Sequence, residues 1–322
     1  MKAAFVGKPG PVEEIRFGEL PDPVPALGEV LVDVVAGSVN PVDTFVRNGM
    51  WPVPGPWPLV LGRDFVGRVV DSANGFAAGE TVWGNSLGHG GRQGAVAERV
   101  AVAADRLYRL PAGVDPFDAV AVVHPAATAY LALFTHGGLR AGQTVLVVGG
   151  GGNVGTALIE LAAAAGARVV ATASAADLDH CVTRGADVAL DYRRTDLPDG
   201  IDLYVDTSGT NDLETAVAHL AFRGRIVLLA GPRSRPVLPA GELYLNDQSV
   251  VGFVISRASA AELADAAAAL NERFAAGGLR PRAVERVPFA EAADAHGRME
   301  RGELHGRRIV LVVRNDGDPV DS

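Results

Sequence analysis

The sequence predicts an α/β protein in which a doubly wound parallel sheet is inserted into a β-rich domain built from both ends of the chain. Residues 1 to about 120 contain short β-branched runs that glycine and proline interrupt. From about Pro116 onward, strand patterns alternate with helical patterns, which is typical of a parallel sheet. Within that alternating region, Gly150, Gly152 and Gly155 form a G-x-G-x-x-G motif between a strand and a helix.

The N-terminal region is expected to fold as a compact antiparallel or barrel-like unit. Its clearest strand patterns lie at 30–35, 66–70 and 96–102. Four prolines alternate with other residues between positions 52 and 58. Because proline lacks a backbone donor and fixes φ, that segment is expected to be an extended loop rather than a helix or a central strand.

The middle of the chain is expected to form the inserted parallel sheet. The predicted strands are 145–148, 168–172, 188–190, 203–205, 225–229 and 249–255. Predicted helices at 154–165, 177–184 and 212–221 separate several of them. Strand–helix alternation of this kind produces parallel strands joined by right-handed crossovers.

The pattern changes again towards the C-terminus. Apolar residues recur at helical spacing from Leu263 to Phe274, followed by a strand at 283–287, a helix at 289–299 and a last strand at 308–313. The predicted domains are therefore 1–118 with 257–322, and 119–256 inserted between them.

The glycine motif predicts a dinucleotide site. Its first glycine permits a tight turn, its second lets the backbone approach a pyrophosphate, and its third lets helix and strand pack closely. The helix beginning near Asn153 and Val154 would present free N–H groups to the phosphates. The alternative is a flexible turn without a ligand, because four successive glycines satisfy the first two positions in any case.

The end of the second inserted strand favours NADPH over NADH. Ser174 stands where NAD-binding folds usually carry an acidic residue that accepts from the ribose 2′-hydroxyl. Downstream, Tyr192, Arg193 and Arg194 can donate to a 2′-phosphate or pair with it. Two observations oppose this interpretation, because the arginines can equally be a solvated loop end and Asp177 is acidic and close in sequence.

Composition excludes several classes of function. The net charge of −9 argues against nucleic acid and anionic membranes as partners. The single cysteine, Cys181, excludes an internal disulfide framework and fits a cytoplasmic location. The first residues lack a secretory apolar core, and no apolar run is expected to reach the roughly 20 residues that span a bilayer.

Metal and nucleophile chemistry are not expected. A catalytic zinc needs about three protein ligands, and the seven histidines show no ligand spacing. His124, which precedes Pro125, is expected to be a buried, hydrogen-bonded histidine. There is no G-x-S-x-G elbow, and Ser208 and Gly231, which follow predicted strands, are expected to contact the cofactor. The cofactor must then carry the reaction.

Several segments together resemble a known family. They are NPVDTFVRNG from Asn40, LGRDFVG from Leu61, GETVW from Gly79, TAY from Thr128, the glycine loop, and GELHG from Gly302. With this order and spacing, the chain resembles the zinc-independent quinone oxidoreductase (zeta-crystallin-like) branch of the medium-chain dehydrogenase/reductase superfamily. Zinc-dependent relatives carry a Cys near Ser38 and a His where this chain has Arg63.

The resemblance implies a GroES-like catalytic domain and a Rossmann domain, with substrate in the cleft between them. It implies NADPH as hydride donor and a quinone or α,β-unsaturated carbonyl as acceptor. It also implies a homodimer formed by edge pairing of the strand near 250–254. The resemblance places Asn40 and Asp43 near nicotinamide and substrate, Thr128 at the carboxamide, and Tyr192 near the 2′-phosphate.

Each proposed catalytic residue has a structural alternative. Asn40 can be a turn former, and Asp43 can cap the following helix. Arg63 can face the substrate or form a surface pair with Asp64. Trp51 stands where relatives often have Tyr, and its indole cannot transfer a proton at neutral pH. Trp51 and Trp57 can be the private core of their loop or a platform for a flat ring.

The sequence therefore predicts an NADPH-dependent, zinc-independent reductase of a quinone or other conjugated carbonyl. Asn40 is expected to donate to the acceptor carbonyl, and the proton is expected to come from water. The alternatives are an enone or enoyl thioester (2-alkenal) reductase of the same superfamily, a non-catalytic NADPH-binding protein, and a zinc alcohol dehydrogenase.

Overall fold

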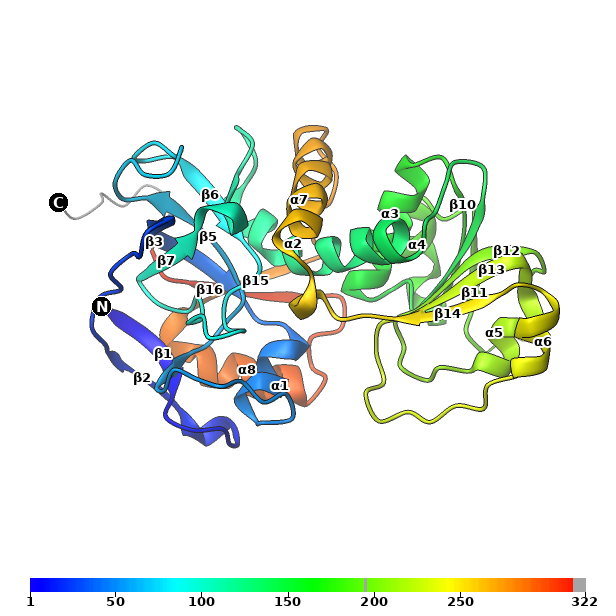
Figure 1. Ribbon diagram of the computed structural model, residues 1–322, viewed down its shortest axis with the longest axis horizontal. Coiled ribbons are helices and arrows are strands. Elements are labelled where there is room, and N and C mark those ends of the chain that lie inside the picture. The colour runs from blue at the N-terminus through cyan, green and yellow to red at the C-terminus, as the bar shows by residue number, and fades with distance from the viewer. Residues whose placement is uncertain (194–195, 315–322) are drawn as a thin grey trace. The chain divides into compact units, whose positions relative to one another are not determined.

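The computed structural model describes residues 1–193 and 196–314, and the chain divides into two compact units (Figure 1). Unit 1 comprises Met1–His124 together with the residues from Leu263 onward, and unit 2 comprises Pro125–Glu262. Both boundaries lie six residues after those predicted from the sequence, at 124 against 118 and at 262 against 256. Arg194, one of the predicted phosphate-binding residues, lies outside the described residues.

Unit 2 contains a six-stranded sheet in the order β11-β10-β9-β12-β13-β14, and every neighbouring pair is parallel. The strands are β9 (Thr144–Val148), β10 (Arg168–Ala173), β11 (Val188–Asp191), β12 (Ile201–Asp206), β13 (Leu220–Leu228) and β14 (Ser249–Gly252). The helices are α3 (Asn153–Ala164), α4 (Leu178–Thr183), α5 (Leu213–His219) and α6 (Ala240–Leu245). In Figure 1, α3 and α4 lie on one face of the sheet and α5 lies on the other.

This arrangement confirms the predicted doubly wound parallel sheet, because the first strand lies in the middle and the order reverses beside it. β9 is apolar along its length, since a central strand is buried on both faces. Two predicted bounds were wrong. β13 begins at Leu220 rather than near 225, directly after α5, and a register shift between Ile201 and Leu203 accommodates it. β14 ends at Gly252 rather than 255.

Unit 1 confirms the predicted β-rich domain built from both ends of the chain. A three-stranded antiparallel sheet holds β1 (Lys2–Val6), β2 (Ile15–Glu19) and β4 (Leu59–Val60). A seven-stranded sheet holds β3 (Glu29–Ser38), β5 (Asp64–Val69), β6 (Thr81–Gly84), β7 (Arg99–Ala103), β8 (Tyr108–Arg109), β15 (Val284–Pro288) and β16 (Arg308–Val312). The helices are α1 (Pro41–Arg47), α8 (Ala292–Glu300) and most of α7 (Ala260–Ala275).

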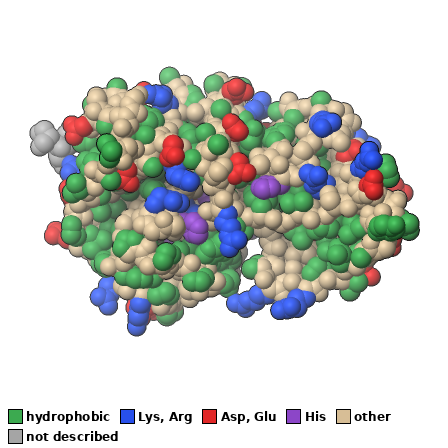
Figure 2. Space-filling model, viewed as in Figure 1, with side chains coloured by type: hydrophobic (Ala, Val, Ile, Leu, Met, Phe, Trp, Pro, Cys, Tyr) green, Lys and Arg blue, Asp and Glu red, His purple; other side chains and the backbone are tan. Residues whose placement is uncertain are grey.

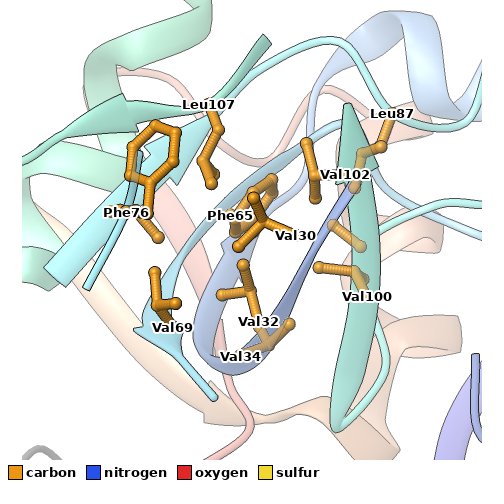
Figure 3. Packing of buried hydrophobic residues seen from close by; sticks show 12 residues of the cluster. Val30, Val32, Val34, Phe65, Val69, Phe76, Leu87, Val100, Val102 and Leu107 are labelled. Atoms are coloured by element: carbon orange, nitrogen blue, oxygen red, sulfur yellow. The ribbon is translucent and has the colours of Figure 1, made fainter. Parts of the chain in front are cut away.

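The core of unit 1 fixes the position of β5, which carries part of the candidate site. Val30, Val32 and Val34 alternate along β3 and pack against Phe65 and Val69 from β5 (Figure 3). Each is at most 2% exposed, and full burial of such a side chain contributes about 1.5–3 kcal/mol. β5 is therefore anchored immediately after Arg63 and Asp64.

One long helix was not predicted from the sequence. α2 (Pro116–Tyr130) continues directly into a π-helical turn, Leu131–His136. The expectation that no apolar run reaches the length of a membrane span was wrong, because this 21-residue helix is long and apolar enough. However, 72% of its apolar window is buried within the fold, as in the core helices of many globular proteins.

Candidate functional site

The predicted glycine loop of unit 2 is a tight turn held by strand β10. The backbone N–H groups of Gly149 and Gly150 both donate to the Thr172 carbonyl, at 3.0 and 2.8 Å. A Cβ added to Gly155 would lie 2.1 Å from the Gly149 carbonyl oxygen, so only glycine fits there. The loop therefore brings the start of α3 against the end of β9, as the motif predicted.

Gly152 is a glycine for another reason. Its φ of −78° suits any residue, and a Cβ there would meet the Gly149 oxygen at 3.4 Å, which is near ordinary contact. Packing within the protein thus does not demand glycine at this position. A phosphate group that approaches the loop backbone closely would require glycine there. Asn153 and Val154 follow as the first residues of α3, and the N–H groups of this first turn are free to bind such a group. This arrangement fits a pyrophosphate.

Asp177, the acidic residue that opposes the NADPH interpretation, lies close to the end of the second strand. Asp177 is 1% exposed, and its Oδ2 accepts a hydrogen bond from Ser174 Oγ at 2.6 Å. A Cβ on Gly151 would lie 2.8 Å from the same carboxylate. A single helical turn, Ala175–Asp177, begins after Ser174 and brings this acid back towards the end of β10, so a carboxylate lies beside the loop.

Tyr192 and Arg193 lie beside that strand end. The Tyr192 N–H donates to the Ala173 carbonyl at 3.0 Å, which continues the pairing of β10 and β11. Arg193 is exposed, and its guanidinium carbon lies 5.3 Å from the centre of the Tyr192 ring. The structure therefore places both residues within reach of the groups at the end of β10, on a surface open to a ligand.

Ser208 and Gly231 follow β12 and β13 at the same carboxyl edge. Ser208 Oγ donates to Asp206 Oδ1 at 2.7 Å, so its hydroxyl proton is engaged within the loop. A Cβ on Gly231 would lie 2.5 Å from the Gly209 oxygen, so this glycine lets the two loops meet. Thr128 lies half-buried on α2. Carboxyl edges of open parallel sheets are where ligands bind.

Three of the four predicted catalytic residues, Asn40, Asp43 and Arg63, lie in a group that we call the buried polar cluster. Every member is at most 8% exposed. The members are Ser38, Asn40, Asp43, Arg63, Asp64, His124 and Arg308. Buried polar side chains are stable when their hydrogen bonds are made internally, and most of these are.

Asp64 is the centre of the cluster. Its Oδ2 accepts from Ser38 Oγ at 2.8 Å and from Asn40 Nδ2 at 2.6 Å, and its Oδ1 lies 3.0 Å from His124 Nδ1. Arg308 closes the ring, since its Nη2 donates to Ser38 Oγ at 3.2 Å and to Asn40 Oδ1 at 2.8 Å. The interpretation of Asp64 as half of a surface pair was therefore wrong.

Asp43 lies within helix α1, at the third position of a capping box with Asn40, and not before the helix as the structural alternative had it. Its Oδ2 accepts from the Asn40 backbone N–H at 2.8 Å and from Asn40 Nδ2 at 3.4 Å. Both amide protons of Asn40 thus meet carboxylates, and the expected donation from Asn40 to a substrate carbonyl is not what this geometry favours. Burial and the nearby Asp64 charge raise the pKa of Asp43 to about 6.

Arg63 is buried near the carboxylates of Asp43 and Asp64. It is 2% exposed, and within the described residues neither its Nε nor its Nη2 has a hydrogen-bond partner. These two nitrogens form one edge of the guanidinium, which suits bidentate contact with oxygen. Burial lowers the pKa of Arg63, while Asp43 and Asp64 oppose that effect.

Trp51 lies apart from the cluster. It is half-buried against Val46, Leu59 and Leu61, so it serves the local core of its loop. Its ring centre lies 6.4 Å from that of His89. Trp57 is 38% exposed beside the prolines of the extended segment. The structure thus favours the packing interpretation of Trp51.

Sequence reasoning missed Ser38, Asp64 and Arg308 as site residues. Each had a signal, because a polar residue ends or begins an otherwise apolar strand. His124 was predicted to be buried and hydrogen-bonded, and the structure confirms this.

The cluster does not fit a catalytic zinc ion. Across residues 1–193 and 196–314, no three His, Cys, Asp or Glu side chains are grouped closely enough to hold a metal. Two guanidinium groups, from Arg63 and Arg308, lie among the acids of the cluster and supply positive charge there.

Residues 26–112 match the alcohol dehydrogenase GroES-like domain family, and residues 153–272 match the zinc-binding dehydrogenase family. The human protein named quinone oxidoreductase is 28% identical over 97% of this chain and 98% of its own. The 2-methylene-furan-3-one reductase of Solanum lycopersicum is 30% identical, over 88% of this chain and 72% of its own. A mycobacterial protein solved in complex with NADPH has a TM-score of 0.81 and 27% identity, covering 97% of this chain and 99% of its own.

Proposed function

Because the chain belongs to the medium-chain dehydrogenase/reductase superfamily, we propose that it is an NADPH-dependent, zinc-independent reductase of a quinone or other conjugated carbonyl. The observation that carries the proposal is the glycine loop. Packing within the protein does not require a glycine at position 152, but a pyrophosphate close to the loop backbone would. Reduced nicotinamide, when bound, supplies a hydride to an electrophilic carbon. The human relative's name supports a quinone as acceptor.

The chain's own residues then have defined tasks. Gly150, Gly152 and the first N–H groups of α3 would hold the pyrophosphate, and Thr128 and Ser208 would contact the nicotinamide half. Arg63 stabilises the negative charge that develops on the acceptor oxygen, because its Nε and Nη2 have no partner within the described chain. Asn40 and Asp43 fix the geometry around Arg63 rather than contacting the acceptor themselves.

An assay of acceptors tests this function. Purified protein is mixed with NADPH and either a juglone-type naphthoquinone or a 2-alkenal, and the loss of NADPH absorbance is followed. We expect turnover with the quinone. Turnover confined to the 2-alkenal would replace the proposal with an enone reductase, which the tomato relative's name supports. Binding of NADPH without consumption by any acceptor would point to a non-catalytic binding protein.

The preference for NADPH is proposed to rest on Tyr192 and Arg193. Replacing Arg193 with alanine removes a charge-assisted contact to the 2′-phosphate, so we expect NADPH affinity to fall about tenfold, or ~1.4 kcal/mol, while NADH affinity is unchanged. Calorimetric titration with both nucleotides measures this. The Asp177→Asn variant keeps an acceptor for Ser174 but loses the charge, and we expect it to bind NADPH more tightly. Equal losses for both nucleotides in the arginine variant would contradict the assignment.

We also propose that the protein is a homodimer. β14 is the last strand of the unit 2 sheet and leaves one edge without a neighbour among the described strands. Large apolar side chains are exposed on β13 and in the segment that joins it to β14, and Figure 2 shows apolar surface in the region of α6. They are Phe222, Val237, Leu238, Tyr244 and Leu245. Sedimentation is expected to give twice the 33.3 kDa chain mass.

A further inference from the structure

A hydrogen-bond network around Asp64 fixes the orientation of His124, which has no role in the proposed function described above. His124 Nδ1 lies 3.0 Å from Asp64 Oδ1, and Ser38 and Asn40 hold the other oxygen of that carboxylate. Arg308 fixes Ser38 and Asn40 in turn and also donates from Nε to the Ala121 carbonyl at 2.8 Å. A carboxylate held this firmly keeps a proton on Nδ1 and sets the direction of the ring, so that Nε2 lies on the side of the ring away from Asp64.

A proton donor must be accessible to its substrate, whereas the carboxylate that orients the donor can be buried. His124 and Asp64 differ in exposure in this way. The Asp64 side chain is fully buried, while 10% of the His124 side chain is exposed. The ring therefore reaches the surface of unit 1 although its carboxylate does not. Other charges act on this ring, since Asp43 lies close enough to couple with it, and Arg63 and Arg308 face the same acids. Such an aspartate–histidine pair is a recurrent device for moving a proton.

We propose that His124, oriented by Asp64, is the proton donor of the reaction, and that the preferred acceptors therefore include enones that must be protonated on carbon. The inference rests on the proposed function. Hydride addition at the β-carbon moves an electron pair onto the α-carbon and oxygen of the acceptor. The α-carbon then forms a C–H bond as the Nε2–H bond of imidazolium breaks, and neutral His124 regains its proton from water. This replaces the expectation that water is the direct donor.

The chain contains its own control for this pair. His219 Nδ1 lies 2.8 Å from Asp199 Oδ1, but that aspartate side chain is 88% exposed and belongs to a surface loop of unit 2. The two pairs share the same contact and differ in their surroundings. An effect of histidine removal that depends on the buried network should therefore appear at His124 and not at His219.

The test uses His124→Gln, Asp64→Asn and the control His219→Gln, with a 2-methyl enone whose reduction creates a stereocentre at the α-carbon. Glutamine keeps an N–H for Asp64 but has no proton to transfer. We expect kcat for the enone to fall about 100-fold or more in His124→Gln, within the usual range for loss of a general acid, with NADPH affinity unchanged. Its product should also lose enantiomeric purity, because water protonates either face. His219→Gln should match the parent protein throughout.

Two further measurements keep the test decisive. Added imidazole should restore enone turnover to the His124→Ala variant. This variant replaces His124→Gln in the test if the glutamine variant folds poorly. In the protein without nucleotide, proton NMR should show a downfield Nδ1–H signal that disappears in His124→Gln and Asp64→Asn and survives in His219→Gln. Quinone reduction should suffer less than enone reduction, because a hydroquinone oxygen takes its proton readily from water.

The outcomes separate the inference from the proposed function. Equal kcat and the same single enantiomer from His124→Gln and the parent protein would overturn the role of His124 and leave the proposed function standing. Failure of the parent protein to consume NADPH with every conjugated acceptor would overturn both. Retention of the downfield signal in Asp64→Asn would show that the carboxylate does not orient the ring.

Discussion

We expect replacement of Gly155 with valine to abolish NADPH binding in calorimetry, because the new side chain cannot be placed without moving the loop. Its Cβ would lie 2.1 Å from the Gly149 oxygen and 2.8 Å from the Gly150 Cα, and both of these are backbone atoms. Overpacking of this kind costs about 1–3 kcal/mol or more in stability, and here the cost falls on the pyrophosphate loop itself. The start of α3 is pushed away from β9, and its N–H groups no longer converge on the ligand.

A pair of companion variants separates damage to the fold from loss of the ligand. Gly152→Ala meets its nearest atom at 3.4 Å, so we expect an unchanged melting temperature and an NADPH affinity lowered about 100-fold, or ~2.8 kcal/mol. Gly241→Ala has nothing within 4 Å of the added atom and should change neither property. Unimpaired NADPH binding by Gly155→Val would remove the loop from the cofactor site.

His296 is expected to make the protein sensitive to mild acid. It is fully buried on α8, and neither of its ring nitrogens has a hydrogen-bond partner within the described residues. Burial, and then the neighbouring Arg47 charge, lower the pKa of His296 from 6.5 to about 3. Between about pH 6.5 and pH 3, His296 is protonated in the unfolded chain but not in the folded chain. The free energy of unfolding therefore falls as the pH drops through this range, by about 1.4 kcal/mol per pH unit.

The His296→Leu variant removes this titration at similar volume. Between about pH 6.5 and pH 5, the parent protein should lose roughly 2 kcal/mol of unfolding free energy relative to the variant, as measured by urea denaturation at each pH. Parallel pH dependence of the parent protein and His296→Leu would show that the buried ring is protonated or hydrated in the folded state.

Much of the fold could be predicted from local pattern. The strand at 145–148 and the helix after it were predicted within one or two residues, because an apolar β-branched run, a glycine turn and an apolar helical stripe occur in sequence. α2 was missed for a physical reason. It is apolar and alanine-rich on nearly all sides, so it lacks the 3.6-residue periodicity by which a half-exposed helix is recognised.

The two halves of the candidate site differed in predictability. A phosphate loop is a contiguous motif, so its glycines were found from spacing alone. The buried polar cluster joins residues as far apart as Asn40 and Arg308, and only the tertiary fold brings them together. The contact of Asp177 with Ser174 could not be read from the sequence for the same reason, because a single helical turn after Ser174 brings the two side chains together.

The contacts of Arg308 bear on the order in which the chain can be completed during synthesis. Unit 2 is continuous, so its whole sheet has been translated before β16 exists. Ser38 and Asn40 are synthesised early, but their hydrogen bonds with Arg308 can form only after Arg308 has been synthesised near the end of the chain. Unit 2 can therefore begin to fold before all the side chains of the buried polar cluster have been synthesised.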